Sequence, residues 1–150
     1  MTTALVLFTL HGLLFLMIIR SLDYLEPEPP LLIAMALAWG ALLANALTVI
    51  ANPAVIDILI NLAPPDFVAA WGRTINAPVI EEAIKALGVI TIVLLAGHRL
   101  TSVADGLVYG ALVGLGFHEI ENINFAFIAV NTADAGDTTK PVINTFSPLG

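Results

Sequence analysis

A pair of glutamates beside a lysine is the first arrangement in this sequence that could carry chemistry. Glu81 and Glu82 are adjacent, and Lys85 follows them by four and three residues. On a helix this spacing lets the lysine reach both carboxylates. One acid could then stay ionised and act as a base while the other holds a proton. The alternative is an ion pair at the membrane surface, which contributes little to stability.

A second polar cluster lies further along the chain, with apolar residues on both sides. Phe117 precedes Glu121 by four residues, and Glu119 lies between them. His118 precedes Glu121 by three residues and Asn122 by four. On a helix, residues three and four apart are neighbours. Ionisable residues inside a bilayer cost about 2.5–3.5 kcal/mol each and are functional candidates by default.

Three glycines precede this cluster at intervals of four residues. Gly106, Gly110 and Gly114 form a series that continues to His118 and Asn122. Stacked small residues let a neighbouring helix approach closely. We therefore expect this stripe to pack against another helix and to bring His118 and Asn122 to the contact. In the alternative interpretation the glycines serve packing alone and His118 is a satisfied core residue.

Two reaction chemistries fit these clusters. In the first, a glutamate removes a proton from a water molecule that attacks a peptide carbonyl, while Asn122 or His118 donates to the oxyanion. In the second, a divalent metal activates the water. The metal ligands would be Glu81, Glu82, His118 and Glu121. Zinc favours nitrogen and sulfur ligands, and the chain has no Cys, so we expect no cofactor and keep zinc as the alternative.

The composition places these residues in a membrane protein. Of the residues, 59% are hydrophobic and 11% are charged, whereas a soluble domain is about 25% charged. The mean hydropathy is +0.96. The net charge of −7 argues against a nucleic-acid partner, because phosphate binding needs clustered basic residues. Without Cys there are no disulfides and no thiol nucleophiles. The lipid bilayer is the expected environment, and a multi-pass protein of the cell membrane is the expected class.

The apolar runs predict an all-α, polytopic transmembrane helix bundle. At roughly 20 residues per span, the chain has room for about four. The expected spans cover residues 3–20, 31–51, 78–97 and 103–130, followed by a polar tail at 131–150, all within a single membrane-embedded domain. If the last two spans are antiparallel, Glu81 and Glu121 lie toward the same side, and tilt could bring them together.

The ends of these spans are predicted from proline and capping residues. Asn52-Pro53 is expected to end the second span. Residues 54–63 are too short to cross a bilayer and predict a re-entrant or interfacial helix. Pro78 suits the first turn of the third span, and Ser102 is the expected N-cap of the fourth.

These motifs resemble those of the PrsW-type intramembrane proteases, in the wider group that includes the CAAX prenyl endopeptidases and the bacterial Abi proteins. Residues 77–85 resemble the EExxK motif of the family. Residues 105–122 resemble its DGxxYG…GxGFxxxEN segment, and residues 26–44 its EP-rich lead into the second helix. The resemblance covers most of the chain.

The resemblance implies peptide-bond hydrolysis within or next to the membrane, on a membrane protein such as an anti-sigma factor. Glu81 would be the water-activating carboxylate, and Glu121 would hold the second-motif position. The resemblance implies a site made of Glu81, Glu82 and Glu121, with Lys85, Asn122 and Phe117 in support. It assigns no role to His118. Both a metal mechanism and a glutamate mechanism are attributed to such families.

The sequence departs from the family pattern in a third motif, a His on a later span. A loop like residues 144–150 usually precedes that span, and no such His occurs in the 150 residues. We therefore expect the chain to be an N-terminal portion of a longer protease domain.

Two other functions remain open. Intramembrane acids also serve proton or cation relays, and a relay here would use Glu81, Glu82, Lys85 and Glu121. A packing or assembly subunit, built on the glycine stripe, is the third interpretation.

Overall fold

The computed structural model describes residues 2–22, 28–97 and 102–134. All regular elements in these ranges are helical. They are α1 (Thr2–Leu22), α2 (Pro30–Ala38), the π-helix η1 (Trp39–Ala44), α3 (Asn45–Leu62), α4 (Pro65–Phe67), the π-helix η2 (Val68–Gly72), α5 (Arg73–Ala96) and α6 (Val103–Asp134). The predicted all-α fold is confirmed. The expected tail lies outside the described residues from position 135 onward.

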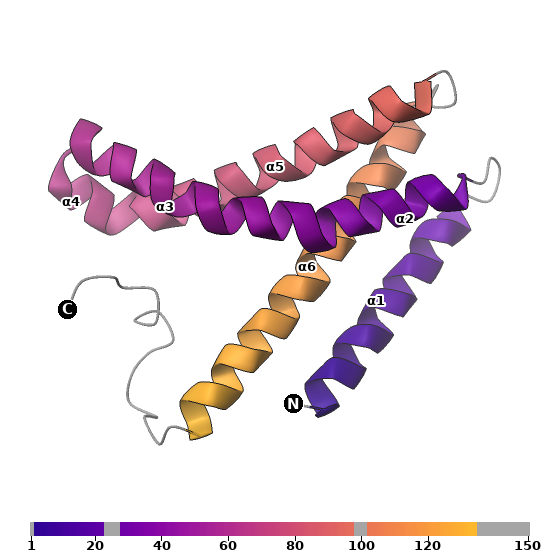
Figure 1. Ribbon diagram of the computed structural model, residues 1–150, viewed down its shortest axis with the longest axis horizontal. Helices are drawn as coiled ribbons and strands as arrows, with labels where there is room; N and C mark the ends of the chain where they lie inside the picture. Colours follow the sequence, from indigo (N-terminus) through magenta and orange to yellow (C-terminus); the bar gives the residue numbers. More distant parts are fainter. Residues whose placement is uncertain (1, 23–27, 98–101, 135–150) are drawn as a thin grey trace.

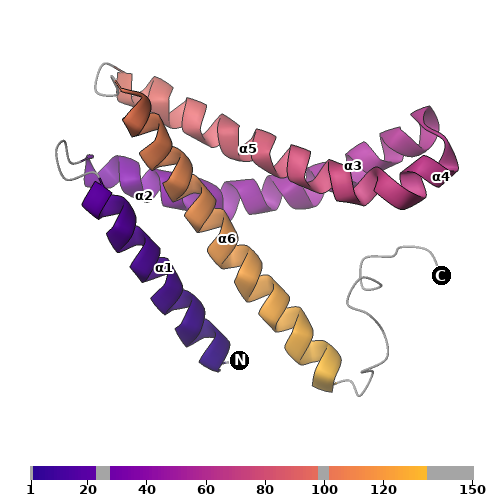
Figure 2. The same cartoon turned by 180° about the vertical axis from the view of Figure 1, so that it is seen from behind.

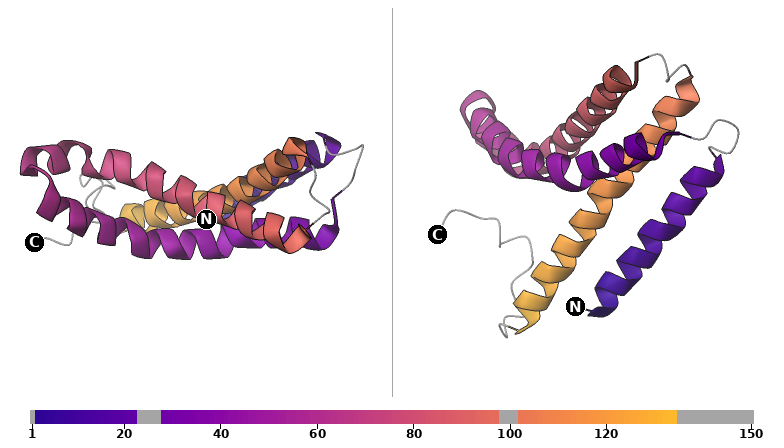
Figure 3. Two further views of the ribbon diagram at one scale, coloured as in Figure 1. Left: turned by 90° about the horizontal axis from the view of Figure 1, so that it is seen from above. Right: turned by 45° about the vertical axis from the view of Figure 1, so that its right-hand side comes forward.

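The helices form two pairs that meet at one end and diverge from it (Figure 1). In one pair, the continuous α2–η1–α3 helix runs antiparallel to α5. In the other, α1 lies along α6, and both pairs remain distinct when the molecule is seen from behind (Figure 2). Helix α6 crosses the first pair where η1 lies and contacts α1, α2, η1 and α5. The right-hand view of Figure 3 shows the same divergence, whereas the two pairs overlap along much of their length when seen from above.

In the described part of the chain, three helices are long and apolar enough to cross a membrane. They cover Thr2–Ser21, Pro30–Leu62 and Val103–Thr132. The fourth expected span lies within α5, which has sufficient length. Every 18-residue stretch of α5, however, includes the three charged residues Glu81, Glu82 and Lys85. These charges, rather than length, separate α5 from the other three helices.

The second apolar helix continues beyond Asn52-Pro53, where the sequence predicts its end. Pro53 lies inside α3, which reaches Leu62, so residues 54–62 of the predicted short helix extend this helix instead of forming a separate one. A proline within an apolar helix is tolerated in membrane proteins. Next to Pro53, the buried Asn76 of α5 donates its side-chain amide to the Asn52 carbonyl at 3.0 Å, and this bond links α3 to α5.

The start of α5 also differs from the prediction, whereas that of α6 agrees with it. Pro78 lies inside α5, because the helical conformation already begins at Pro65 and continues through η2. Helix α6 begins where predicted. The Ser102 backbone N–H donates to Asp105 Oδ2 at 3.0 Å, and Ser102 Oγ accepts the Asp105 backbone N–H at 3.2 Å. This reciprocal arrangement, a capping box, satisfies backbone donors at the start of a helix.

The helices cross most closely between η1 and α6, through two glycines. A Cβ atom added at Gly40 would overlap the Val113 carbonyl oxygen, and one added at Gly116 would overlap that of Leu37. The surrounding core is formed by Ile19, Leu32, Ile33, Ala36, Ile92, Tyr109, Leu112, Val113 and Leu115. Only glycine permits this backbone-to-backbone approach.

The expected glycine stripe is not the packing face of α6. A Cβ atom added at Gly106, Gly110 or Gly114 would meet no other described atom within 4 Å. The prediction was wrong because the larger apolar side chains of α6 define a different buried face, which includes Val113 and Phe117. The glycine that packs closely, Gly116, belongs to that face.

Candidate active site

The glutamate motif lies on the face of α5 that packs against η1 and α6. Ile84 and Gly88 are buried on this face, and Glu81 and Lys85 are half-buried beside them. Glu82 is exposed. The helical period explains the difference, because residues three and four apart share a face and immediate neighbours do not. Adjacent glutamates therefore have separate environments.

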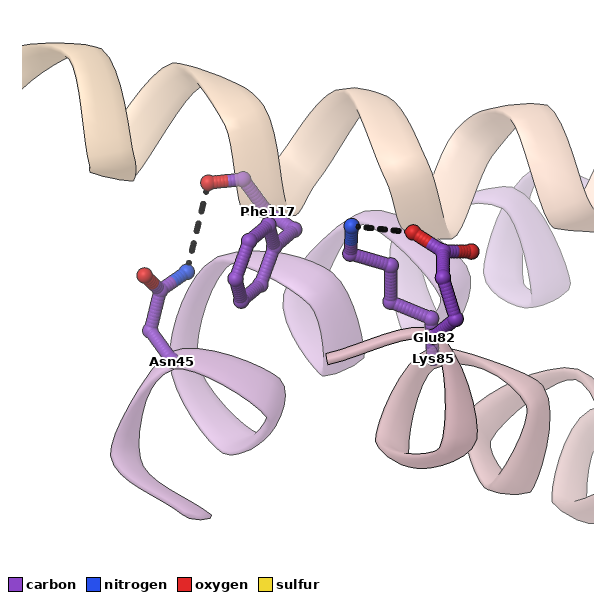
Figure 4. A network of polar contacts seen from close by, with 4 residues as sticks. All are labelled: Asn45, Glu82, Lys85 and Phe117. Atoms are coloured by element: carbon purple, nitrogen blue, oxygen red, sulfur yellow. Dashed lines mark hydrogen bonds and ion pairs between the residues drawn. The ribbon is translucent and has the colours of Figure 1, made fainter. Parts of the chain in front are cut away.

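Lys85 links the two motif helices. Its Nζ donates to Glu82 Oε1 at 2.8 Å and lies 4.2 Å from the centroid of the Phe117 ring on α6. Phe117 is 2% exposed, so its ring is a fixed surface for the ammonium group (Figure 4). Such a cation–π contact is worth about 0.5–1 kcal/mol when exposed and more when desolvated. The lysine was expected to reach both carboxylates, and its ion pair is with Glu82.

Glu81 and Glu121 approach each other one helical turn from this contact. Glu81 precedes Lys85 by one turn and Glu121 follows Phe117 by one turn, and α5 and α6 run in opposite directions (Figure 1). The two carboxylates are close enough to interact electrostatically, and Lys85 also acts on Glu81. Among the described residues, no hydrogen-bond partner is assigned to either carboxylate. The structure thus brings together Glu81, Lys85, Phe117 and Glu121.

The other two candidates lie differently. Asn122 is half-buried on α6, next to Glu121. His118 is exposed, and its ring lies 6.2 Å from that of His11 on α1. The helical period explains this exposure, because His118 directly follows the buried Phe117 and immediate neighbours on a helix do not share a face.

The predicted metal ligands do not form a metal site in the part of the chain that is described. No group of three His, Cys, Asp or Glu residues there could hold an ion. Glu82 is turned outward and paired with Lys85, and His118 lies toward α1. The described residues therefore do not fit a bound zinc ion, and we derive no step through one.

An interaction between α1 and α6 was missed in the sequence. His11 Nδ1 lies 2.6 Å from Glu119 Oε1, and Gly12 leaves room for the same glutamate. Glu119 also lines an open groove of about 480 Å³ between α1, α6 and the α2–η1 segment. His11 is an ionisable residue within an apolar run, so the rule that selected Glu81 and Glu121 would also have selected it.

A second missed pair is buried. Tyr109 of α6 is 0% exposed and donates its hydroxyl to Glu28 Oε2 at 2.6 Å. Both residues lie in segments that resemble the family motifs, but neither was predicted as a site residue. The contact joins the residues before α2 to the first half of α6, and so it helps to hold the helix that carries Glu121.

Long apolar helices around a half-buried pair of carboxylates are the features of an α-helical membrane protein. A family model described as PrsW family intramembrane metalloprotease matches residues 28–147, and the chain belongs to this family. The predicted resemblance is confirmed. No curated protein and no solved structure matches the chain. Membership makes this a membrane protein of an intramembrane protease family, whose substrates are membrane proteins.

Proposed function

We propose that the protein is an intramembrane endopeptidase in which Glu81 activates the attacking water. The observation that supports this is the position of Glu81, half-buried beside the α5–α6 contact and close enough to Glu121 to interact electrostatically. A carboxylate with no hydrogen-bond partner among the described residues has lone pairs available for water. Glu119 and Glu28, by contrast, have side-chain partners.

The reaction follows general acid–base catalysis. Glu81 takes a proton from water, and the water oxygen bonds to the carbonyl carbon of the substrate peptide. The carbon–nitrogen bond then breaks, and the proton passes from Glu81 to the leaving amine. Glu121 holds the water on the other side, and the Asn122 amide is the donor available to the oxyanion.

Three further residues support the site. The Lys85 ammonium lies one helical turn from Glu81 and interacts with it electrostatically. Phe117 holds this ammonium through its ring, and Glu82 pairs with it from the exposed side. These contacts support the assignment of Lys85, Phe117 and Glu82 as positioning residues.

The proposed setting is a multi-pass protein of the cell membrane, acting on a single-span membrane protein such as an anti-sigma factor. Family membership and the membrane-length helices support this setting. A substrate segment must expose one peptide bond to Glu81. Helical substrates therefore need to unwind locally, because a regular helix shields its backbone carbonyls.

The decisive variant is Glu81→Gln, which keeps the shape of the side chain and removes its basicity. Purified protein in liposomes is presented with a library of single-span substrates. We expect kcat to fall by about 100-fold or more, as is typical for the loss of a general base. Asp57→Asn, at an exposed position of α3, is the matched control and leaves kcat unchanged. Undiminished cleavage by Glu81→Gln would remove Glu81 from the mechanism.

The same assay tests the metal alternative. We expect cleavage to survive exhaustive chelation when Glu81 acts without a metal. Loss of activity on chelation, restored by added zinc, would instead favour a metal-activated water. The Glu81→Gln variant gives the reference for background hydrolysis in both measurements.

A further inference from the structure

We propose that the π-helical segment η1 sets the register of the two motif helices, and that the positioning residues are Trp39, its first residue, and Asn45, which directly follows it as the first residue of α3. Each donates a side-chain hydrogen bond to a backbone carbonyl of a motif helix. Neither residue belongs to the motifs around Glu81 and Glu121. The part of this inference that concerns catalysis rests on the proposed function. The part that concerns the register of α5 and α6 rests on the hydrogen bonds and packing contacts alone.

Trp39 fixes the turn of α5 that carries the glutamate motif. Its Nε1 donates to the Ile84 carbonyl at 3.3 Å. Ile84 lies between Glu82 and Lys85, so the bond is made at the centre of the motif. The indole also packs on Gly88, where an added Cβ atom would overlap the ring. Rotation or sliding of α5 would break both contacts together.

Asn45 fixes the turn of α6 that leads to Glu121. Its Nδ2 donates to the Phe117 carbonyl at 3.3 Å, as Figure 4 shows. The same amide lies 3.0 Å from the Gly40 carbonyl and 3.3 Å from that of Ala41. It therefore joins the π-helical turn to the residue whose ring contacts Lys85.

The π-helical turn explains why one short segment can contact two helices. A π-helix pairs residues five apart, and such turns occur frequently at functional sites. The wider turn changes the rotation between the side chains before and after it, so that Trp39 contacts α5 and Asn45 contacts α6. Gly40 lies between them and brings the backbones of η1 and α6 together.

Register matters because the proposed chemistry depends on two carboxylates from different helices. A misplacement of about 1 Å can reduce a rate by about 100-fold. A shift between α5 and α6 would separate Glu81 from Glu121 without removing either. Trp39 and Asn45 thus act through position, and they do not contact the reacting atoms.

The first test is Trp39→Phe, which keeps an aromatic ring near Gly88 and removes the Nε1–H donor. We expect kcat for substrate cleavage to fall about tenfold with KM little changed, as displacement of a catalytic group predicts. The matched control is Trp71→Phe, at the other tryptophan of the chain, which is 53% exposed. This control leaves both constants at wild-type values.

The second test uses Asn45→Asp, a variant of nearly the same shape that replaces the amide donor with a carboxylate. Asn61→Asp is its matched control, because Asn61 is exposed and bonds only within its own helix, to the Asp57 carbonyl at 2.7 Å. We expect Asn45→Asp to lower kcat at least as much as Trp39→Phe. If Asn45→Asp does not fold, Trp39→Phe still decides the question.

A spectroscopic measurement reads the register without proteolysis. The chain has no Cys, so two introduced cysteines can carry spin labels with no background. Ile75→Cys on α5 and Phe127→Cys on α6 are both exposed, at 50% and 57%. Double electron–electron resonance between them should show a shifted or broader distance distribution in Trp39→Phe and Asn45→Asp, and an unchanged one in the two controls.

The outcomes separate this inference from the proposed function. A changed distance together with a lower kcat supports it. A wild-type distance, or a changed distance with wild-type kcat, overturns it. If the wild-type protein cleaves no substrate, the proposed function fails, and the distance distribution alone decides whether η1 sets the register.

Discussion

Helix α6 carries two glutamates whose surroundings differ. On the side of α1, Glu119 lies 2.6 Å from His11. On the side of α5, Glu121 approaches Glu81, and no hydrogen-bond partner is assigned to it among the described residues. The two glutamates are two residues apart, which is about 200° around a helix. The same residue type thus becomes a link between helices on one face and a candidate catalytic group on the other.

The difference shows how to separate structural from functional acids in an apolar protein. An intramembrane carboxylate that is fully paired stabilises the contact in which it lies. One that faces another carboxylate is kept at a cost, and function is the usual reason for keeping it. Glu28, whose carboxylate accepts a bond from Tyr109 in the core, belongs with Glu119 in the first group.

The largest expected effect contrasts the two α6 glutamates directly. Glu121→Gln should lower kcat for substrate cleavage by about 100-fold, because it removes the second carboxylate of the site. Glu119→Gln should keep kcat within about threefold, because this side chain only links helices. Steady-state cleavage in liposomes measures both. Equal losses in the two variants would remove the proposed distinction between the two faces.

The next effect concerns the glycines that determine which face of α6 points where. Gly116→Ala should destabilise the fold by about 1–3 kcal/mol, because its methyl group would overlap the Leu37 carbonyl. Gly110→Ala meets no described atom within 4 Å and should stabilise the helix by about 0.5–1 kcal/mol. Unfolding in detergent, followed by circular dichroism, gives both values. If Gly110→Ala destabilises the fold, the stripe of Gly106, Gly110 and Gly114 is a packing face.

A smaller effect tests the α1 side. His11→Phe keeps an aromatic ring beside Phe15, whose centroid lies 4.6 Å from that of His11. It should cost about 0.6–1.7 kcal/mol, the range for a polar contact between membrane helices. His118→Phe, at an exposed position of α6, is the control. If His11→Phe loses cleavage but keeps the wild-type stability, then His11 on α1 takes part in the mechanism.

The smallest effect concerns a buried hydroxyl. Thr48 is 8% exposed, and its Oγ1 has no hydrogen-bond partner among the described residues. Thr48→Val should be neutral or stabilise the fold by up to about 1 kcal/mol, because it removes an unsatisfied polar atom without changing shape. Thermal unfolding measures this, and cleavage should be unchanged. A loss of activity would make Thr48 part of the site.

Several features could be predicted from the sequence for clear physical reasons. Low charge and long apolar runs require helices, because a bilayer permits no unpaired backbone. The EExxK and FxxxEN patterns placed Glu81 and Glu121 on helices, and Ser102 marked the start of α6. The helix boundaries predicted at Pro53 and Pro78 were wrong, because both prolines lie inside helices.

The packing face of α6 could not be predicted from spacing. The regular series of Gly106, Gly110 and Gly114 was more conspicuous than Gly116, yet only Gly116 opposes another backbone. Several faces of an apolar helix are suitable for burial, so the choice depends on which partner helix fits. Likewise, no local signal linked Trp39 to Ile84, because these residues are 45 positions apart.

The sequence by itself determined the helical membrane class, the family and the identity of the acids that could act. It did so because composition and short motifs depend on neighbouring residues. The tertiary structure decided which of these acids lie close enough to interact electrostatically and which are paired elsewhere. That outcome depends on the rotation and register of α5 and α6, which are set by contacts with η1 and α1 between residues distant in the chain.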